Sequence, residues 1–259
     1  MNTPLDRSQN QVNPKLGLSW QAAEQTTVRG AVFRTLKRSL VANQTLEPTQ
    51  VAGFNQFFDD IEASDVWTYA AAIDQKFSST LYGGIWGMHR DLQVPVIYAD
   101  TATGTTSNVQ WDWHDEIVRP YLFWTPTRNL ALSAEYQYEH FERTNDNQTI
   151  GFEHVTTQKV PLGARYFLPN GLTFGIKGTY YDQSGNFKPK TGNCCVEGSD
   201  NFWLFDAGIA YRLPQRHGFV TLTAVNVFDR KFNFQETDFS NPTIVPTRSI
   251  FARISLSLP

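Results

Sequence analysis

Residues able to ligate a metal or to move a proton are densest in one short stretch, WDWHDE, from Trp111 to Glu116. If the stretch is a strand, Asp112, His114 and Glu116 share one face, which is an arrangement suited to a metal site or an acid/base pair. No partner ligands are identifiable at a distance, so we favour a solvated strand end near an external rim, with the tryptophans in an interfacial girdle. We predict no metal, no cofactor and no catalytic residue.

The rest of the sequence carries no motif of known catalytic chemistry. No GxSxG, Walker or GxGxxG pattern occurs, and Asp59 and Asp60 lack the spacing of an EF-hand calcium loop. The other histidines are scattered and form no HExxH or His-x-His pattern: His89, His140, His154 and His217. We therefore expect a protein that is not an enzyme. The alternative is an outer-membrane enzyme with its site at the external rim, near Trp111 to Glu116.

The two cysteines, Cys194 and Cys195, are adjacent in the segment TGNCCVEGSD. Neighbouring Cα atoms lie about 3.8 Å apart, which is short of ordinary disulfide geometry, and the pair does not form the CxxC pattern of zinc sites. Two thiols in a loop and a rare vicinal bridge both remain open.

The composition excludes several classes of protein. Charged residues make up 18% and aromatic residues 14% of the chain, which is unlike the high charge and low hydrophobicity of a disordered protein. No run approaches the roughly 18 apolar residues of a membrane-spanning helix. The net charge of −3 gives no reason to expect a nucleic-acid partner. No signal peptide is visible, so the chain is either cytosolic or a piece of a longer exported protein.

The dominant hydrophobic pattern has a period of two. In residues 171–181, Phe174 and Ile176 fall on one face while Thr173 and Lys177 fall on the other. Such alternation over eight or more residues indicates a strand, and it recurs along the whole chain. We count about eleven strands of roughly 10–14 residues, which is long for a sandwich but suits a tilted strand crossing a bilayer.

The connections between these strands alternate in length. Short ones span 23–25, 78–80, 126–129, 169–171 and 214–218, and long polar ones span 37–65, 99–108, 145–151, 185–199 and 231–246. Outer-membrane barrels have short periplasmic turns on one rim and long external loops on the other. The final strand would then end on the periplasmic side.

The two faces of the predicted strands differ in polarity. One face is apolar, with aromatic residues near strand ends that suit an interfacial girdle: Trp67, Trp124, Tyr166, Trp203 and Tyr211. The other face carries charges, which would be costly in a dry core but acceptable in a water-filled lumen. Our lumen-lining candidates are Arg119, Glu135, Arg165, Lys177, Arg212 and Arg253. They would either tune solute passage or form a hydrated wall with a cross-strand charge ladder.

These patterns predict an all-β, antiparallel, up-and-down transmembrane β-barrel; the alternative is a soluble all-β protein. Bacterial single-chain barrels have even strand numbers, so about eleven strands suggest the C-terminal half of a larger barrel. We expect residues 1–12 to be an external loop or a disordered start. Residues 13–259 would form a partial outer-membrane β-barrel, with no plug domain and no signal peptide.

Two motifs resemble the barrels of TonB-dependent outer-membrane receptors. The segment from Asn226 to Arg230, NVFDR, resembles the N-[LV]-F-D-[RK] motif of their penultimate strand, and the segment from Asn13 to Trp20 resembles their N-P-K-x-G-x-x-[WY] strand pair. The stretch TLEPTQVAGFNQFFDD also resembles a plug-less group of such barrels that follows tetratricopeptide repeats. The C-terminus, Ser257-Leu258-Pro259, departs from the aromatic ending of the family.

The resemblance implies a 22-stranded barrel in the outer membrane of a Gram-negative bacterium, with a plug and a TonB box that this chain does not show. The implied function is uptake of a chelated metal or another small solute. The implied partners are outer-membrane lipid, the barrel-assembly machinery and TonB through an N-terminal region. The alternative is a plug-less barrel that serves as a membrane anchor or export port for an upstream periplasmic repeat region, with no transport activity of its own.

Overall fold

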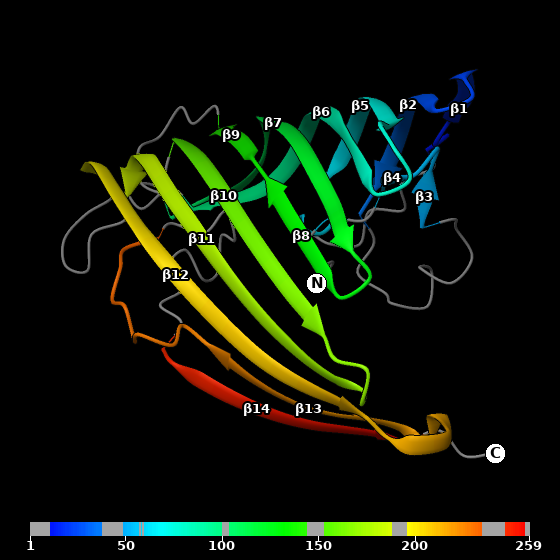
Figure 1. The fold of residues 1–259 in the computed structure, drawn as a ribbon. Helices are drawn as coiled ribbons and strands as arrows, with labels where there is room; N and C mark the ends of the chain where they lie inside the picture. The colour runs from blue at the N-terminus through cyan, green and yellow to red at the C-terminus, as the bar shows by residue number, and fades with distance from the viewer. Residues whose placement is uncertain are drawn as a thin grey trace.

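The computed structural model describes residues 11–37, 49–56, 58, 60–99, 104–143, 153–187, 196–234 and 247–256. Their dominant feature is one wide antiparallel sheet that curves into an arc (Figure 1). Its strands are β1 (Lys15–Ala23), β2 (Thr26–Leu36), β5 (Asp65–Lys76), β6 (Leu81–Ala99), β7 (Thr106–Thr127), β8 (Leu130–Glu135), β9 (Gln137–Arg143), β10 (His154–Phe167), β11 (Leu172–Phe187), β12 (Val196–Arg212), β13 (Gly218–Val225) and β14 (Ser249–Leu256). A separate small hairpin is formed by β3 (Gln50–Val51) and β4 (Phe54–Asn55).

Strands that follow one another in the chain also lie side by side in the sheet, so the topology is up-and-down as predicted. The strands β8 and β9 lie on one line broken at Tyr136, and both pair with β7 and β10. The described sheet therefore has eleven strand positions, which matches the expected number. Within the described residues, β1 and β14 pair on one side only and lie at the two ends of the arc in Figure 1.

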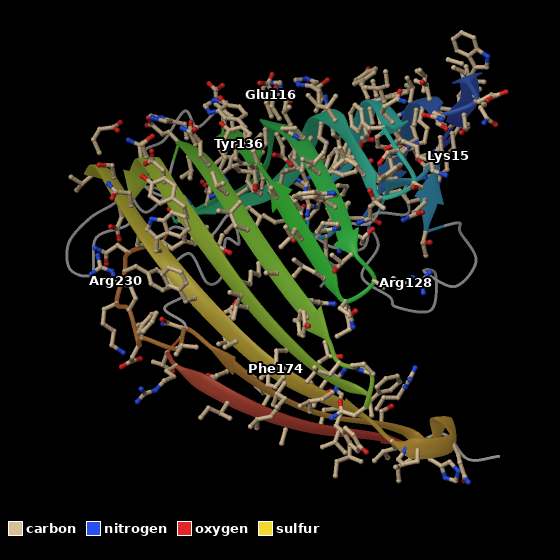
Figure 2. All side chains as sticks on the ribbon, in the orientation of Figure 1. Lys15, Glu116, Arg128, Tyr136, Phe174 and Arg230 are labelled. Atoms are coloured by element: carbon tan, nitrogen blue, oxygen red, sulfur yellow. The ribbon has the colours of Figure 1, made fainter. Side chains whose placement is uncertain are left out.

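Several strands are longer than the 10–14 residues expected from the sequence, up to 22 residues in β7. The predicted loop at 185–199 is correspondingly shorter, because β11 runs to Phe187 and β12 begins at Val196. Short and long connections still alternate, so the sheet has a short-turn rim and a long-loop rim. Figure 2 shows Arg128 in the turn between β7 and β8 on the first rim, and Glu116 toward the second. No helix in the described part of the chain is long and apolar enough to cross a membrane.

The register confirms that apolar and polar residues separate onto two faces. Ile176 pairs with Ala164 and Ala207, and its side chain is 67% exposed, whereas the neighbouring Lys177 pairs with Gly163 and Asp206. We call the face of Ile176 the outer face and the face of Lys177 the inner face. Four of the five predicted girdle residues are exposed large side chains on the outer face, namely Trp124, Tyr166, Trp203 and Tyr211, and Trp67 lies on the same face, half-buried.

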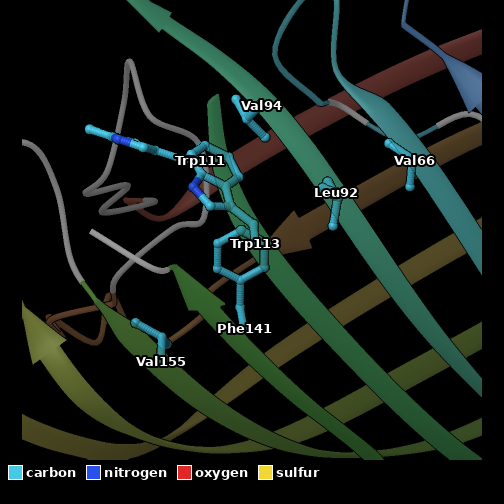
Figure 3. Close-up of a cluster of buried hydrophobic side chains, with 7 residues drawn as sticks. All are labelled: Val66, Leu92, Val94, Trp111, Trp113, Phe141 and Val155. Atoms are coloured by element: carbon cyan, nitrogen blue, oxygen red, sulfur yellow. The ribbon is translucent and has the colours of Figure 1, made fainter. Parts of the chain in front are cut away.

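The prediction that the tryptophans of WDWHDE belong to the girdle is wrong. Trp111 and Trp113 point to the inner face and are buried, 7% and 3% exposed. They pack with Leu92, Val94 and Phe141 in a hydrophobic cluster that Val66 and Val155 complete (Figure 3). The reason is parity: the alternation that places His114 on the outer face places both flanking tryptophans inside.

Part of the first long connection also lies against the inner face instead of projecting outward. Phe54 of β4 packs with Phe33, Ala72 and Met88, all on the inner side of the sheet, and Ala31 belongs to the same cluster. The β3–β4 hairpin therefore covers the inner side of β2, β5 and β6 in the middle of these strands.

Candidate functional site

The inner face brings all six predicted lumen residues onto one side of the sheet. In the register, Glu135 faces Tyr121, Arg165 faces Gly175, Lys177 faces Asp206 and Arg253 faces Thr221, all on the inner face. Arg119 and Arg212 lie an even number of residues along their strands from Tyr121 and Asp206, so they are on the same face. The six residues come from six strand positions between β7 and β14. Each therefore points to the side that a barrel of this curvature would enclose.

Two of the six form an ion pair. Arg119 Nε donates to Glu135 Oε2 at 2.9 Å, and a second guanidinium nitrogen bonds to the same oxygen. The pair spans β7 and β8, so it forms one rung of the predicted charge ladder. By contrast, Arg165, Lys177, Arg212 and Arg253 make no ion pair within the described part of the chain.

A second set of charges, centred on Arg90, was missed by the sequence analysis. Arg90 donates to Asp115 Oδ2 at 3.0 Å and to Asp60 Oδ2 at 2.6 Å, and its guanidinium lies 3.7 Å from the centre of the Phe58 ring. The Arg90 and Asp115 side chains are only 4% and 6% exposed. Asp60, considered above for calcium, instead neutralises Arg90. Arg90 lies opposite Asp115 in the register between β6 and β7, which the sequence alone does not fix.

The β3–β4 hairpin is held on the inner face by Arg29. Arg29 bonds to Asp74 Oδ2 at 2.7 Å and donates to the carbonyl oxygen of Ala52 at 3.1 Å, and its guanidinium lies over the Phe54 ring. Asp74 also accepts a hydrogen bond from the Tyr121 hydroxyl. The ionic network of Arg29, Asp74 and Tyr121 on the strands therefore holds the β3–β4 hairpin against the inner face.

Aromatic and cationic side chains meet at the long-loop end of the inner face. The guanidinium of Arg143 lies 4.3 Å from the centre of the Trp113 ring and 5.1 Å from that of Phe141. The two rings contact edge to face with centroids 5.7 Å apart. Such cation–π contacts help to hold the guanidinium in place.

Three polar residues of WDWHDE, Asp112, His114 and Glu116, lie on the outer face, whereas Asp115 lies on the inner face beside Arg90. The structure gives His114 and Glu116 partners that we did not anticipate. His114 faces Asp91 across β6 and β7, and Glu116 faces His89. His89 Nε2 and His114 Nδ1 lie 3.1 Å and 2.8 Å from the same oxygen, Asp91 Oδ1. His140 of β9 faces Glu116 from the other side in the register, and its Nδ1 lies 2.8 Å from the Thr156 hydroxyl oxygen.

The NVFDR motif forms a tight turn after β13. Asn226 and Asp229 have positive φ angles of 49° and 51°, and the N–H of Asp229 donates to the carbonyl oxygen of Asn226 at 2.8 Å. The Asn226 side chain is buried and bonds to the backbone of Arg230. The motif thus fixes the exit from the penultimate strand, on the long-loop rim.

The fold and the two-faced register define the class of this protein as an outer-membrane β-barrel. Residues 2–229 match the family described as TonB dependent receptor-like, beta-barrel. The chain belongs to this family, whose members are receptors of the outer membrane.

Solved structures support the same fold. FpvA of P. aeruginosa, bound to heterologous pyoverdines, has a TM-score of 0.57 at 11% identity, over 93% of this chain and 32% of that one. BauA, the ferric preacinetobactin receptor of Acinetobacter baumannii, has a TM-score of 0.56 at 14% identity, over 93% of this chain and 35% of that one. This chain therefore spans about a third of the receptors it matches. No curated protein matches it in sequence.

Proposed function

We propose that this chain forms part of the lumen wall of a receptor that takes up an anionic chelated metal, or another small anionic solute, across the outer membrane. The observation that carries the proposal is the set of inner-face cations without ion-pair partners in the described residues: Arg165, Lys177, Arg212 and Arg253. Cations that line a wet channel raise the local concentration of anions and favour their passage. BauA, one of the structural neighbours, is a ferric preacinetobactin receptor.

The test is binding of anionic ferric chelates to the full protein in detergent micelles. Quenching of tryptophan fluorescence measures the binding. Three chelate classes serve as probes: catecholate, hydroxamate and α-hydroxycarboxylate complexes. The Arg165→Gln/Lys177→Gln/Arg253→Gln variant should weaken the binding of an anionic chelate at least tenfold. Arg128→Gln, which removes a cation from the turn between β7 and β8 and not from the inner face, is the control and should bind like the parent protein. Equal affinity in both variants would contradict the proposal.

For the organisation of the chain, we propose that residues 1–12 form an external loop or a disordered start and that residues 13–259 form a partial barrel. Within the described residues, β1 and β14 pair on one side only, and this supports the organisation because bilayer lipid does not tolerate open sheet edges. Further strands would complete the barrel, and the barrel-assembly machinery would insert it into outer-membrane lipid. TonB would act through an N-terminal region outside this chain.

The second candidate function is a plug-less barrel acting as an anchor or export port for an upstream periplasmic repeat region. The β3–β4 hairpin favours it, since this segment of the barrel chain itself covers part of the inner face. Conductance in a planar bilayer separates the two candidates. A plug-less port should conduct ions steadily, whereas a plugged receptor should conduct little until the plug is displaced.

A further inference from the structure

Four side chains form a compact group on the outer face of the β6–β7 pair. In the register His89 faces Glu116 and Asp91 faces His114, so the four occupy two adjacent rows on one side of the sheet. Residues facing each other across antiparallel strands have Cβ atoms about 4.5–5.5 Å apart. The group is therefore assembled by the backbone register itself.

The ligand atoms of three of these residues converge on one point. His89 Nε2 lies 3.1 Å and His114 Nδ1 lies 2.8 Å from Asp91 Oδ1, and the ligand atoms of all three residues lie within 4.8 Å of one another. A tetrahedral ion with bonds of about 2.0–2.1 Å separates its ligand atoms by about 3.3–3.4 Å. Rotation of these side chains within the 4.8 Å span of their ligand atoms would bring the atoms to this spacing and accommodate such an ion.

Glu116 supplies the outer partner that a metal-bound histidine usually has. Its Oε1 lies 3.3 Å from His89 Nδ1, on the opposite side of the imidazole from Asp91. A carboxylate at this position fixes the ring orientation and raises the basicity of the nitrogen that faces the ion. The His89 and His114 rings are also nearly parallel, 21° apart.

The group is open to ions in solution. On the outer face, the residue pairs between the short-turn rim and the group are apolar, and the last of them is Gly87 with Val118. The group therefore lies next to this apolar band, on its long-loop side. The side chains of His89, Asp91 and His114 are 42%, 43% and 44% exposed. A cleft lined by Asp91, Asp112 and His114 adjoins it. The neighbouring acid Asp65 is already bonded to Arg34.

We propose that His89, Asp91 and His114 bind a divalent transition metal ion of the Zn²⁺ class on the exterior of the barrel, with Glu116 as a positioning residue. Two imidazole nitrogens and one carboxylate oxygen form a ligand set that Zn²⁺ prefers, and the fourth position stays open on the exposed side. The ion joins β6 to β7 above the apolar band. This site is separate from the inner-face cations and independent of the solute that the lumen passes.

The test is titration of the full, metal-free protein in detergent micelles with Zn²⁺ by calorimetry, and with Co²⁺ by its visible absorption. The expected result is one ion per chain, with affinity reduced at least tenfold in His89→Ala, Asp91→Asn and His114→Ala. Glu116→Gln should reduce affinity about 10–100-fold while keeping one ion per chain, because it removes only the orienting partner.

Two matched variants separate a built site from general attraction of cations. His217→Ala removes an exposed histidine on the short-turn rim, and Asp112→Asn removes one negative charge beside the group without removing a ligand. Both should bind Zn²⁺ like the parent protein. The proposal is overturned if the parent protein binds no Zn²⁺, or if the ligand variants bind it as tightly as these controls. Far-ultraviolet circular dichroism of each variant confirms that the sheet is formed.

Discussion

The side-chain amide of Asn226 holds Arg230 by both of its backbone groups. Oδ1 of Asn226 accepts from the Arg230 N–H at 2.8 Å, and Nδ2 donates to the Arg230 carbonyl oxygen at 3.0 Å. Asn226 is 1% exposed and has a φ of 49°. Asparagine suits this position because it tolerates the left-handed region and carries a donor and an acceptor on one short side chain.

Replacing Asn226 should therefore destabilise the turn after β13. Asn226→Gly keeps the backbone freedom but loses both side-chain bonds, so we expect a loss of about 1–3 kcal/mol in the free energy of unfolding. Asn226→Ala adds the left-handed penalty of about 1–2 kcal/mol. Urea unfolding in micelles measures both. Equal stability of the parent, glycine and alanine proteins would show that the motif has no structural role.

The Arg90 network gives a second prediction about stability. Removing one partner of a buried ion pair leaves the other charge unpaired, so Asp115→Asn and Arg90→Met should each cost about 3–5 kcal/mol. The double variant should cost clearly less than the sum of the two. Strict additivity in this double-mutant cycle would contradict the contact between the two side chains.

Gly53 should be required for docking of the β3–β4 hairpin. Its φ is +84°, and a Cβ built there would lie 2.4 Å from Nη1 of Arg29, so Gly53→Ala would strain the backbone and displace the arginine. Gly104→Ala is the matched control, because its φ is +65° but nothing lies within 4 Å of the added carbon. Protease cleavage within residues 49–56 should become faster in the first variant than in the second. The same cleavage rate in both would argue against docking.

Asp229 gives a prediction about pH. The backbone N–H of Arg248 and the Lys231 ammonium group, in that order, hold the pKa of Asp229 below its ordinary value. A lowered folded pKa means that the carboxylate stabilises the loop contact above the ordinary aspartate value of about 3.9, and that this contribution is lost as the pH falls through the folded value. NMR titration of the Asp229 carboxyl carbon should give a midpoint below the ordinary value, and Lys231→Ala should raise it. A midpoint at or above the ordinary value would contradict the contact.

Alternation alone predicted the strands, their approximate number and the face of Lys177, because a period of two assigns every second residue to one side. It could not predict that Trp111 and Trp113 are buried, since alternation does not say which face is enclosed at the long-loop end. The pairings of His89 with Glu116 and of Arg90 with Asp115 depend on the register between two strands. Register is set by where the intervening loop reverses the chain, and polar sequences such as residues 99–108 do not fix that point.

The central claim is that the outer face meets lipid while the inner face meets water, and neighbouring residues on β11 test it directly. After Cys194 and Cys195 are changed to serine, Ile176→Cys and Lys177→Cys are compared in outer membranes with a membrane-impermeant maleimide. The account predicts rapid labelling at position 177 and protection at position 176. In a second experiment, a bimane attached at position 176 in detergent should be quenched by brominated lipid after reconstitution. Equal labelling at both positions, or the reverse pattern, would contradict it.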